Sequence, residues 1–217
     1  MILYDYILSP SCYKVRLLAS LLGVKLELRA VDFHPGREHK GDELLALNPA
    51  GSIPILVDGE DVLTESAAIL SYIAAKHGQN WLATSDAGEV GAQQQWLSFS
   101  HRLTSALGGA RLVEMLHFPG DLAALQEAGI AALRELEAAL FARRLTGQTF
   151  LVGDRITIAD IACFPYVALA PDGSVSLDPY ASIRIWMRAI RAQPRFIEMP
   201  GIHRLHELAP DPLAGDA

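Results

Sequence analysis

Glu65 and Ser66 are the residues whose types and position most clearly suit ligand binding. They open a segment, residues 66–76, whose apolar side chains recur at helical spacing. The first turn of a helix offers unpaired N–H groups and the positive end of its dipole, so it attracts a carboxylate. The Glu65 carboxylate could in turn accept hydrogen bonds from an ammonium group. The pair therefore suits the amino-acid end of a small peptide, although Ser66 could equally serve as a plain helix cap.

A second group precedes the first at short spacing. Ile53 and Pro54 begin a short apolar run, residues 53–57, after a loop rich in Asn, Pro and Gly. Proline is tolerated at the first position of a strand, because no hydrogen bond of the sheet is lost there. The Asp-Gly pair at 58–59 then predicts a tight turn into a returning strand at 62–64.

The third group consists of Ser9, Ser11 and Cys12, between an expected first strand (2–6) and an expected helix (13–22). A serine hydroxyl can donate a hydrogen bond to a thiolate, and a helix start favours negative charge. A cysteine at the same place would have a lowered pKa and could form a mixed disulfide. The serines could also serve only as helix caps. There is no Cys-x-x-Cys motif, so a dithiol oxidoreductase is disfavoured.

Composition excludes several classes of function. The net charge of −7 and the isoelectric point near 5.4 give no support for a nucleic-acid partner or a basic membrane-binding surface. No apolar run approaches the ~18 residues of a membrane span, and the N-terminal residues lack the pattern of a signal peptide. Two cysteines make no disulfide framework, so we expect a cytoplasmic setting. His203 and His206 lack Cys or Glu partners, so no metal is expected.

The chain changes character near residue 78. Residues 1–77 alternate strands and helices and end in a hairpin and a helix, which is the thioredoxin-like arrangement with its first strands parallel. Residues 78–88 are polar and suit a linker, and residues 89–217 contain helices only. The predicted fold is therefore an α/β thioredoxin-like N-terminal domain followed by an all-α C-terminal domain.

Two features organise the expected helical domain. A long amphipathic helix spans residues 88–116, and its paired glycines at 108–109 are expected to bend it. Thr157 and Asp160 form a capping box at the start of a later helix, with Asp in place of the usual Glu or Gln. We expect this capping box to act in folding and not in chemistry.

The segment from His39 to Ala75 resembles the glutathione-binding half of the cytosolic glutathione transferases, most closely the bacterial theta-like members. The motif at 157–160 agrees with the helical domain of that family. The resemblance implies that Pro54 is cis and that the main chain of Ile53 pairs with the cysteinyl unit of glutathione, as an added strand would. It assigns the following residues to glutathione binding: His39, Lys40, Ser52, Ile53, Pro54, Glu65 and Ser66.

The family pattern also places an activating group just after the first strand. The register puts Ser9 in this role, with Ser11 and Cys12 as rivals. A thiol of pKa ~8.5 needs a shift of two units, about 2.7 kcal/mol, to be thiolate near neutral pH. A hydrogen bond to the charge contributes roughly 1.5–3 kcal/mol and a helix start roughly 0.3–2 kcal/mol, so no general base is required. The resemblance implies that His39 and Lys40 bind the glycyl carboxylate of glutathione. The alternative is that His39 is a histidine of a surface loop without this role.

The resemblance therefore implies a cytoplasmic, homodimeric detoxification enzyme. Glutathione would be its co-substrate, without a metal, and the thiol would attack a small apolar electrophile. One alternative is glutathione-dependent thiol transfer through Cys12, as in beta- and omega-like members. Another is a non-catalytic interaction module of the same fold, although the intact residue pairs 53–54 and 65–66 argue against a module that has lost glutathione.

Overall fold

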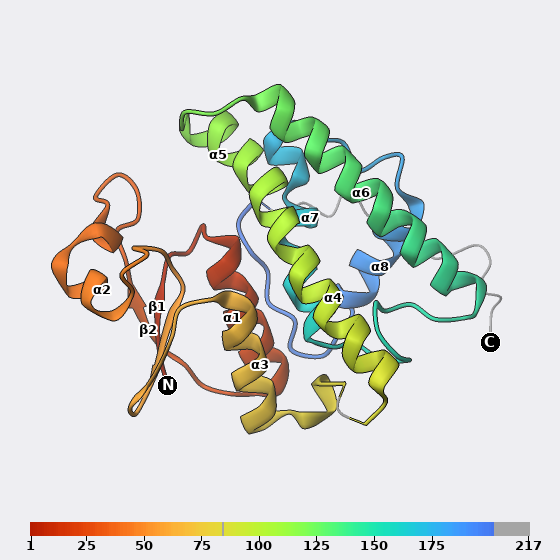
Figure 1. Ribbon diagram of the computed structural model, residues 1–217, viewed down its shortest axis with the longest axis horizontal. Coiled ribbons are helices and arrows are strands. Elements are labelled where there is room, and N and C mark those ends of the chain that lie inside the picture. Colours follow the sequence, from red (N-terminus) through yellow and green to blue (C-terminus); the bar gives the residue numbers. More distant parts are fainter. Residues whose placement is uncertain (84, 202–217) are drawn as a thin grey trace. The chain divides into compact units, whose positions relative to one another are not determined.

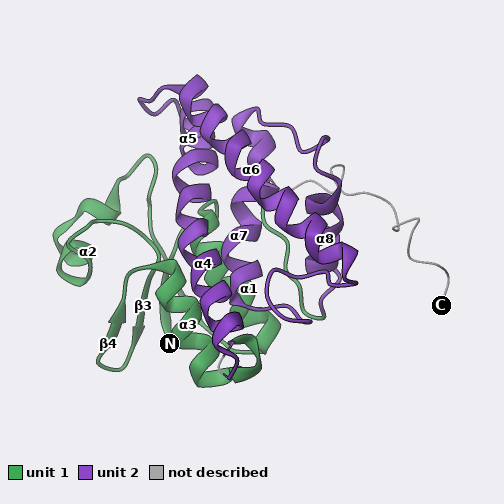
Figure 2. Cartoon of the chain, turned by 45° about the vertical axis from the view of Figure 1, so that its right-hand side comes forward, with its two compact units in different colours: residues 1–82, 194–200 green, residues 83–193, 201–217 purple. Residues whose placement is uncertain are grey.

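The computed structural model describes residues 1–83 and 85–201, which form two compact units (Figures 1 and 2). Unit 1 contains Met1–Leu82 and the later segment Pro194–Pro200, and unit 2 contains Ala83–Gln193 together with Gly201. His203 and His206 lie outside the described residues. Among the described residues, no helix combines the length and apolar character needed to cross a membrane.

Unit 1 is built on a four-stranded sheet with the order β2-β1-β3-β4. The first two strands are parallel, and the β1–β3 and β3–β4 pairs are antiparallel. A strand, a crossover helix and a parallel strand are thus followed by a hairpin and a closing helix. The elements are β1 (Ile2–Asp5), α1 (Pro10–Leu22), β2 (Glu27–Ala30), η1 (Glu38–Lys40), α2 (Asp42–Leu47), β3 (Ile55–Asp58), β4 (Asp61–Leu63), α3 (Ser66–His77) and η2 (Gln79–Trp81).

The two faces of the sheet are buried by different helices. Successive side chains of a strand point to opposite faces, so Leu3 and its partner Leu56 share one face and Tyr4 and its partner Ile55 share the other. The Tyr4 face packs against Leu44 of α2. Helices α1 and α3 pack against one another, and Figure 1 shows them on the side of the sheet away from α2. All four of these strand residues are less than 9% exposed.

The element boundaries differ from the sequence prediction where turns decide them. Helix α1 begins at Pro10, three residues earlier than predicted, because Ser9 caps it and proline suits the first helical position. Strand β3 begins at Ile55, so Ile53 and Pro54 lie in the loop before it. Strand β1 ends at Asp5, and Tyr6 belongs to the following turn.

The described elements of unit 2 are all helical, in agreement with the predicted all-α domain. Helix α7 is its centre, because every one of its residues is buried. The elements are α4 (Ala87–Leu103), η3 (Thr104–Gly108), α5 (Gly109–Leu116), α6 (Leu122–Leu145), α7 (Ile158–Ala168), η4 (Ala170–Gly173) and α8 (Ala181–Arg191).

The predicted single helix over 88–116 is interrupted by a π-helical turn, Thr104–Gly108. The paired glycines lie at the end of this turn, and their lack of a side chain serves close packing. A Cβ atom on Gly108 would come within 2.6 Å of the Tyr166 ring, and one on Gly109 within 2.9 Å of the Leu125 side chain. The glycines therefore let α7 and α6 approach this segment.

The predicted capping box at the start of α7 is confirmed. The Thr157 hydroxyl accepts from Ala159 N–H at 3.3 Å, and the Asp160 carboxylate accepts from Thr157 N–H at 2.9 Å. Asp160 is fully buried and also accepts hydrogen bonds from Leu151 N–H at 2.9 Å and from the Trp186 indole at 2.8 Å. Burial raises the pKa of the Asp160 carboxyl, and these donors oppose the rise. One side chain therefore joins the α7 start to a loop and to α8.

Candidate functional site

Ser9 lies at the start of α1, directly after a tight turn. The turn is closed by a hydrogen bond of 2.8 Å from Ser9 N–H to the Tyr6 carbonyl. The Ser9 side-chain oxygen accepts from Cys12 N–H at 3.2 Å, so the serine is a helix cap. Capping uses a lone pair of the hydroxyl oxygen, and a hydroxyl that accepts in this way can still donate its proton. The capping role and a thiolate-holding role are therefore compatible at this residue.

A buried ion pair braces the turn that carries Ser9. Arg16 Nε lies 3.0 Å from Asp5 Oδ1, and another guanidinium nitrogen donates to the Ile7 carbonyl at 3.0 Å. Asp5 and Arg16 are 6% and 9% exposed. Burial raises the pKa of the Asp5 carboxyl, and the Arg16 charge opposes the rise. This pair was not predictable from the sequence, because an ion pair between a strand and a helix has no local sequence signature.

Cys12 does not have the environment that its position suggested. The side chain is fully buried, and its thiol contacts the Tyr4 carbonyl at 3.9 Å. Burial raises the pKa of the Cys12 thiol to about 12, although the hydrogen bond with Ser9 opposes the rise. The expectation that the helix start lowers this pKa is therefore wrong, because desolvation of a buried thiolate outweighs the dipole.

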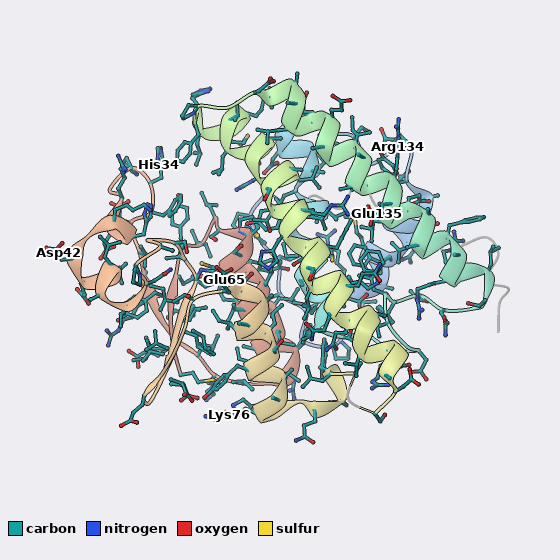
Figure 3. All side chains as sticks on the ribbon, viewed as in Figure 1. His34, Asp42, Glu65, Lys76, Arg134 and Glu135 are labelled. Carbon is teal, nitrogen blue, oxygen red and sulfur yellow. The ribbon has the colours of Figure 1, made fainter. Side chains whose placement is uncertain are left out.

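The start of α3 has the unpaired donors that a carboxylate ligand requires. Glu65 occupies the capping position but makes no side-chain capping bond, and Ser66 is the first helical residue and not the cap. The first hydrogen bond of the helix runs from Ile69 N–H to the Glu65 carbonyl. The preceding N–H groups of the helix, from Ser66 to Ala68, therefore have no partner within the described residues. Figure 3 shows Glu65 at this helix end.

Helix α8 in unit 2 shows how a carboxylate fits such a helix end. The Glu137 carboxylate of α6 accepts hydrogen bonds from Ser182 N–H and Ile183 N–H, each at 2.9 Å. Its two oxygens thus satisfy two of the N–H groups that a helix start leaves unpaired. The first turn of α3 offers the same kind of donors, and there the acceptor is missing from the described residues.

A buried asparagine, Asn48, holds the loop before β3 by hydrogen bonds. The Asn48 amide donates to the Ser52 carbonyl at 2.8 Å and to the Ser52 hydroxyl at 3.0 Å, and its oxygen accepts from Ala50 N–H at 3.1 Å. The Ile53–Pro54 bond is cis, as the resemblance implied. Neither the N–H nor the carbonyl of Ile53 makes a hydrogen bond within the described residues, so its main chain is available to a ligand.

His39 and Lys40 lie in η1 and contact the neighbouring loops of unit 1. Lys40 Nζ donates to the Ala50 carbonyl at 3.2 Å, which connects η1 to the loop that carries Ile53. His39 is 8% exposed and stacks on Phe33. Burial lowers the pKa of His39, and the charges of Lys40 and Arg37 add to this effect.

The predicted site residues all lie in unit 1. Ser9 caps α1, and Ser11 and Cys12 lie in its first turn; the other residues lie on η1, on the loop before β3 and at the start of α3. Sequence reasoning missed Asn48, Phe33 and the Asp5–Arg16 pair. The Asn-Pro-Gly character of the loop was a usable signal for Asn48, because asparagine side chains commonly bond to backbone groups in turns.

Comparison with known proteins now decides the family. Residues 1–75 match the family description "Glutathione S-transferase, N-terminal domain", and residues 120–194 match "Glutathione S-transferase, C-terminal domain". Glutathione S-transferase 3 of Zea mays is 34% identical over 208 residues, which are 89% of this chain and 90% of that protein. The chain belongs to the glutathione S-transferase family. The predicted family and the two-part fold class are thereby confirmed.

The other relatives include both possible glutathione S-transferases and elongation factors. A solved structure of a possible glutathione S-transferase from Rhodopseudomonas palustris has a TM-score of 0.81 and 30% identity, covering 91% of this chain and 97% of that one. Elongation factor 1-gamma 1 of Oryza sativa subsp. japonica is 34% identical over 172 residues, 78% of this chain but 41% of that protein. The chain thus spans about two fifths of the length of such relatives. The matched family descriptions name no class, so the theta-like character stays a prediction.

Proposed function

We propose that the chain binds glutathione in unit 1 and uses the Ser9 hydroxyl to hold its thiolate for attack on a small apolar electrophile. The observation that carries this proposal is the first turn of α3, where no side chain caps the helix and Glu65 remains exposed. In the proposal, the N–H groups of this turn and the Ser66 hydroxyl bind the γ-glutamyl carboxylate. Glu65 accepts from the ammonium group on the same carbon.

The remaining parts of glutathione are proposed to extend along the loops of unit 1. The unpaired N–H and carbonyl of Ile53, before the cis Pro54, would pair with the cysteinyl unit in the manner of an added strand. Ser52, held by Asn48, lies beside them in this loop. His39 and Lys40 would bind the glycyl carboxylate, with Lys40 already donating to the Ala50 carbonyl.

The proposed chemistry needs only a donor and a helix start. In the proposal, the Ser9 oxygen caps α1 through a lone pair while the hydroxyl proton donates to the thiolate. A hydrogen bond to the thiolate contributes roughly 1.5–3 kcal/mol, which covers a thiol pKa shift of one to two units. The thiolate sulfur then forms a bond to an electrophilic carbon, and the displaced group leaves with the bonding electrons. Ser9 stays unmodified throughout.

Exposed apolar side chains precede Ser9 and support an apolar electrophile. Ile7 is 52% exposed and Leu8 is 37% exposed, both within the turn that ends at Ser9. Large apolar side chains exposed together beside a reactive group suit contact with an apolar compound. We therefore propose that this turn contributes to electrophile binding.

The thiol-transfer alternative is disfavoured by the burial of Cys12. Attack on a disulfide requires an accessible thiolate, whereas the Cys12 side chain is fully buried and its thiol has a pKa of about 12. The interaction-module alternative is favoured by one observation, the similarity to elongation factor 1-gamma proteins. Absence of glutathione binding would turn the assignment to that alternative.

A homodimer in the cytoplasm is the assembly and location that the family resemblance favours. We propose the dimer on that ground alone. Sedimentation velocity over a range of protein concentrations tests it, because a dimer gives twice the chain mass of 23.5 kDa. A single species at the monomer mass would contradict the proposed assembly.

Replacing Glu65 by glutamine tests the binding mode. The change keeps the size of the side chain but removes the charge that pairs with the ammonium group. We expect glutathione affinity, measured by calorimetry, to fall by roughly 1.5–3 kcal/mol. Glu60→Gln is the matched control, because Glu60 is an exposed carboxylate of the hairpin turn in the same unit. Equal affinities for the two variants would overturn the role of Glu65.

A further inference from the structure

Three aromatic rings of unit 1 join the turn before Ser9 to η1. The Tyr6 and Phe33 ring centroids are 5.6 Å apart with an interplanar angle of 31°. The Phe33 and His39 centroids are 4.2 Å apart with an angle of 22°, which is a stacked pair. Phe33 is therefore the central ring, and it contacts both the turn that leads to Ser9 and the histidine of η1.

The environment of His39 leaves one edge of its ring for a ligand. The Nδ1 atom is buried and has no hydrogen-bond partner within the described residues. Protonation there would place an N–H group where no acceptor is found, beside the charges of Lys40 and Arg37, which agrees with the lowered pKa of His39. The neutral ring with its proton on Nε2 avoids this cost. The Nε2 edge is then the donor that remains.

Aromatic stacking fixes the plane of that ring and hence the direction of its N–H. An imidazole free to rotate about its side-chain bonds would spend part of its time pointing the N–H elsewhere, and that entropy would be lost on binding. A stacked neighbour at 4.2 Å restricts this rotation. No hydrogen bond at Nδ1 provides an alternative restraint in the described residues.

We propose that Phe33 is a positioning residue, which holds the His39 ring so that Nε2–H points at the glycyl carboxylate of glutathione. The inference rests on the proposed function, because it requires glutathione to bind. Phe33 would then affect the binding of the glycyl part of glutathione only. The γ-glutamyl and cysteinyl parts of the ligand lie on α3 and on the loop before β3 in the proposal, and neither belongs to the ring stack.

The test compares two ligands that differ only by glycine. Calorimetry is performed on the full chain with glutathione and with γ-glutamylcysteine, which lacks the glycyl carboxylate. We expect Phe33→Leu to weaken glutathione binding about five- to tenfold, as partial loss of a hydrogen bond to a charge would. Binding of γ-glutamylcysteine should stay within about twofold of the wild type, a change of roughly 0.4 kcal/mol. Phe33→Tyr keeps the ring and should behave like the wild type.

A double-mutant cycle separates positioning from a general structural effect. In a His39→Ala background, Phe33→Leu should have no further effect on glutathione affinity, since the ring that it positions is gone. Nitrogen chemical shifts of the His39 imidazole, measured by NMR without ligand, should change in Phe33→Leu and not in Phe33→Tyr. This second measurement reports on the ring even when the affinity of a variant is low.

The outcomes distinguish a failure of the Phe33 role from a failure of glutathione binding itself. Equal weakening of both ligands by Phe33→Leu, an undiminished effect in the His39→Ala background, or unchanged imidazole shifts would overturn the role of Phe33 and leave glutathione binding intact. If the wild type binds neither glutathione nor γ-glutamylcysteine, the proposed function fails, and the role of Phe33 fails with it.

Discussion

Replacement of Asp160 by alanine is expected to lower the melting temperature by about 10 °C. The carboxylate accepts hydrogen bonds from Leu151 N–H, Thr157 N–H and the Trp186 indole, and it is fully buried. Removing it leaves three buried donors unsatisfied, and each such donor costs about 1–3 kcal/mol. A total above about 3 kcal/mol corresponds to a shift of roughly 10 °C in a chain of this size. Thermal unfolding followed by circular dichroism measures the change.

Asp154→Ala is the matched control for this substitution. Asp154 lies in the same region of the chain, but its side chain is 85% exposed, and within the described residues it pairs only with Arg155, at 3.5 Å. Exposed pairs contribute little, so the melting temperature should change by less than about 2 °C. At a temperature where Asp160→Ala is still folded, its affinity for glutathione should equal that of the wild type. Lost affinity without lost stability would contradict a purely structural role.

Replacement of Ser9 by alanine is expected to raise the pKa of bound glutathione by roughly one to two units. The hydroxyl that donates to the thiolate is lost, so less of the bound thiol is ionised at a given pH. Conjugation near neutral pH should fall about 10- to 100-fold and should recover as the pH rises above the new pKa. The ultraviolet absorbance of the bound thiolate, followed against pH, measures the shift. Because Ser9 also caps α1, a loss of about 1 kcal/mol in stability should accompany it.

Three comparison variants decide which side chain acts on the thiol. Ser9→Thr keeps a hydroxyl and should keep a pKa close to that of the wild type. Ser11→Ala should leave the pKa of the bound thiol unchanged, because the proposal assigns the thiolate to Ser9 and not to the rival hydroxyl of Ser11. Cys12→Ala should also leave it unchanged, because Cys12 is buried. A rise in Ser11→Ala with none in Ser9→Ala would move the role to Ser11. Disulfide reduction lost in Cys12→Ala, with conjugation absent from the wild type, would favour thiol transfer.

Features set by a few neighbouring residues were predictable from the sequence. The capping box needs Thr157 and Asp160 three residues apart, and the structure has both of its hydrogen bonds. The hairpin around Gly59 follows from the Asp-Gly pair after a short apolar run, and Gly59 has the positive φ of 65° that such a turn uses. The two-part fold followed from the change of periodicity near residue 78.

Features set by distant contacts were not predictable in the same way. Cys12 has the local signature of an activated thiol, but its burial depends on the packing of α1, and desolvation reverses the expected pKa. Phe33 stacks on His39, and Asp5 pairs with Arg16. Neither pair lies within a single helix or strand, so no helical or strand repeat predicts it. The π-helical turn ends at Gly108, which packs closely against Tyr166 of the distant helix α7.

The central claim is that unit 1 binds glutathione and holds it as a thiolate. The most direct test is an ultraviolet difference titration of the wild-type chain with glutathione near neutral pH, with Ser9→Ala measured in parallel. The account predicts a saturable thiolate band in the wild type, and in Ser9→Ala a band that develops only at a pH roughly one to two units higher. Saturable binding of glutathione with no thiolate band in either protein, or no binding at all, would contradict the account.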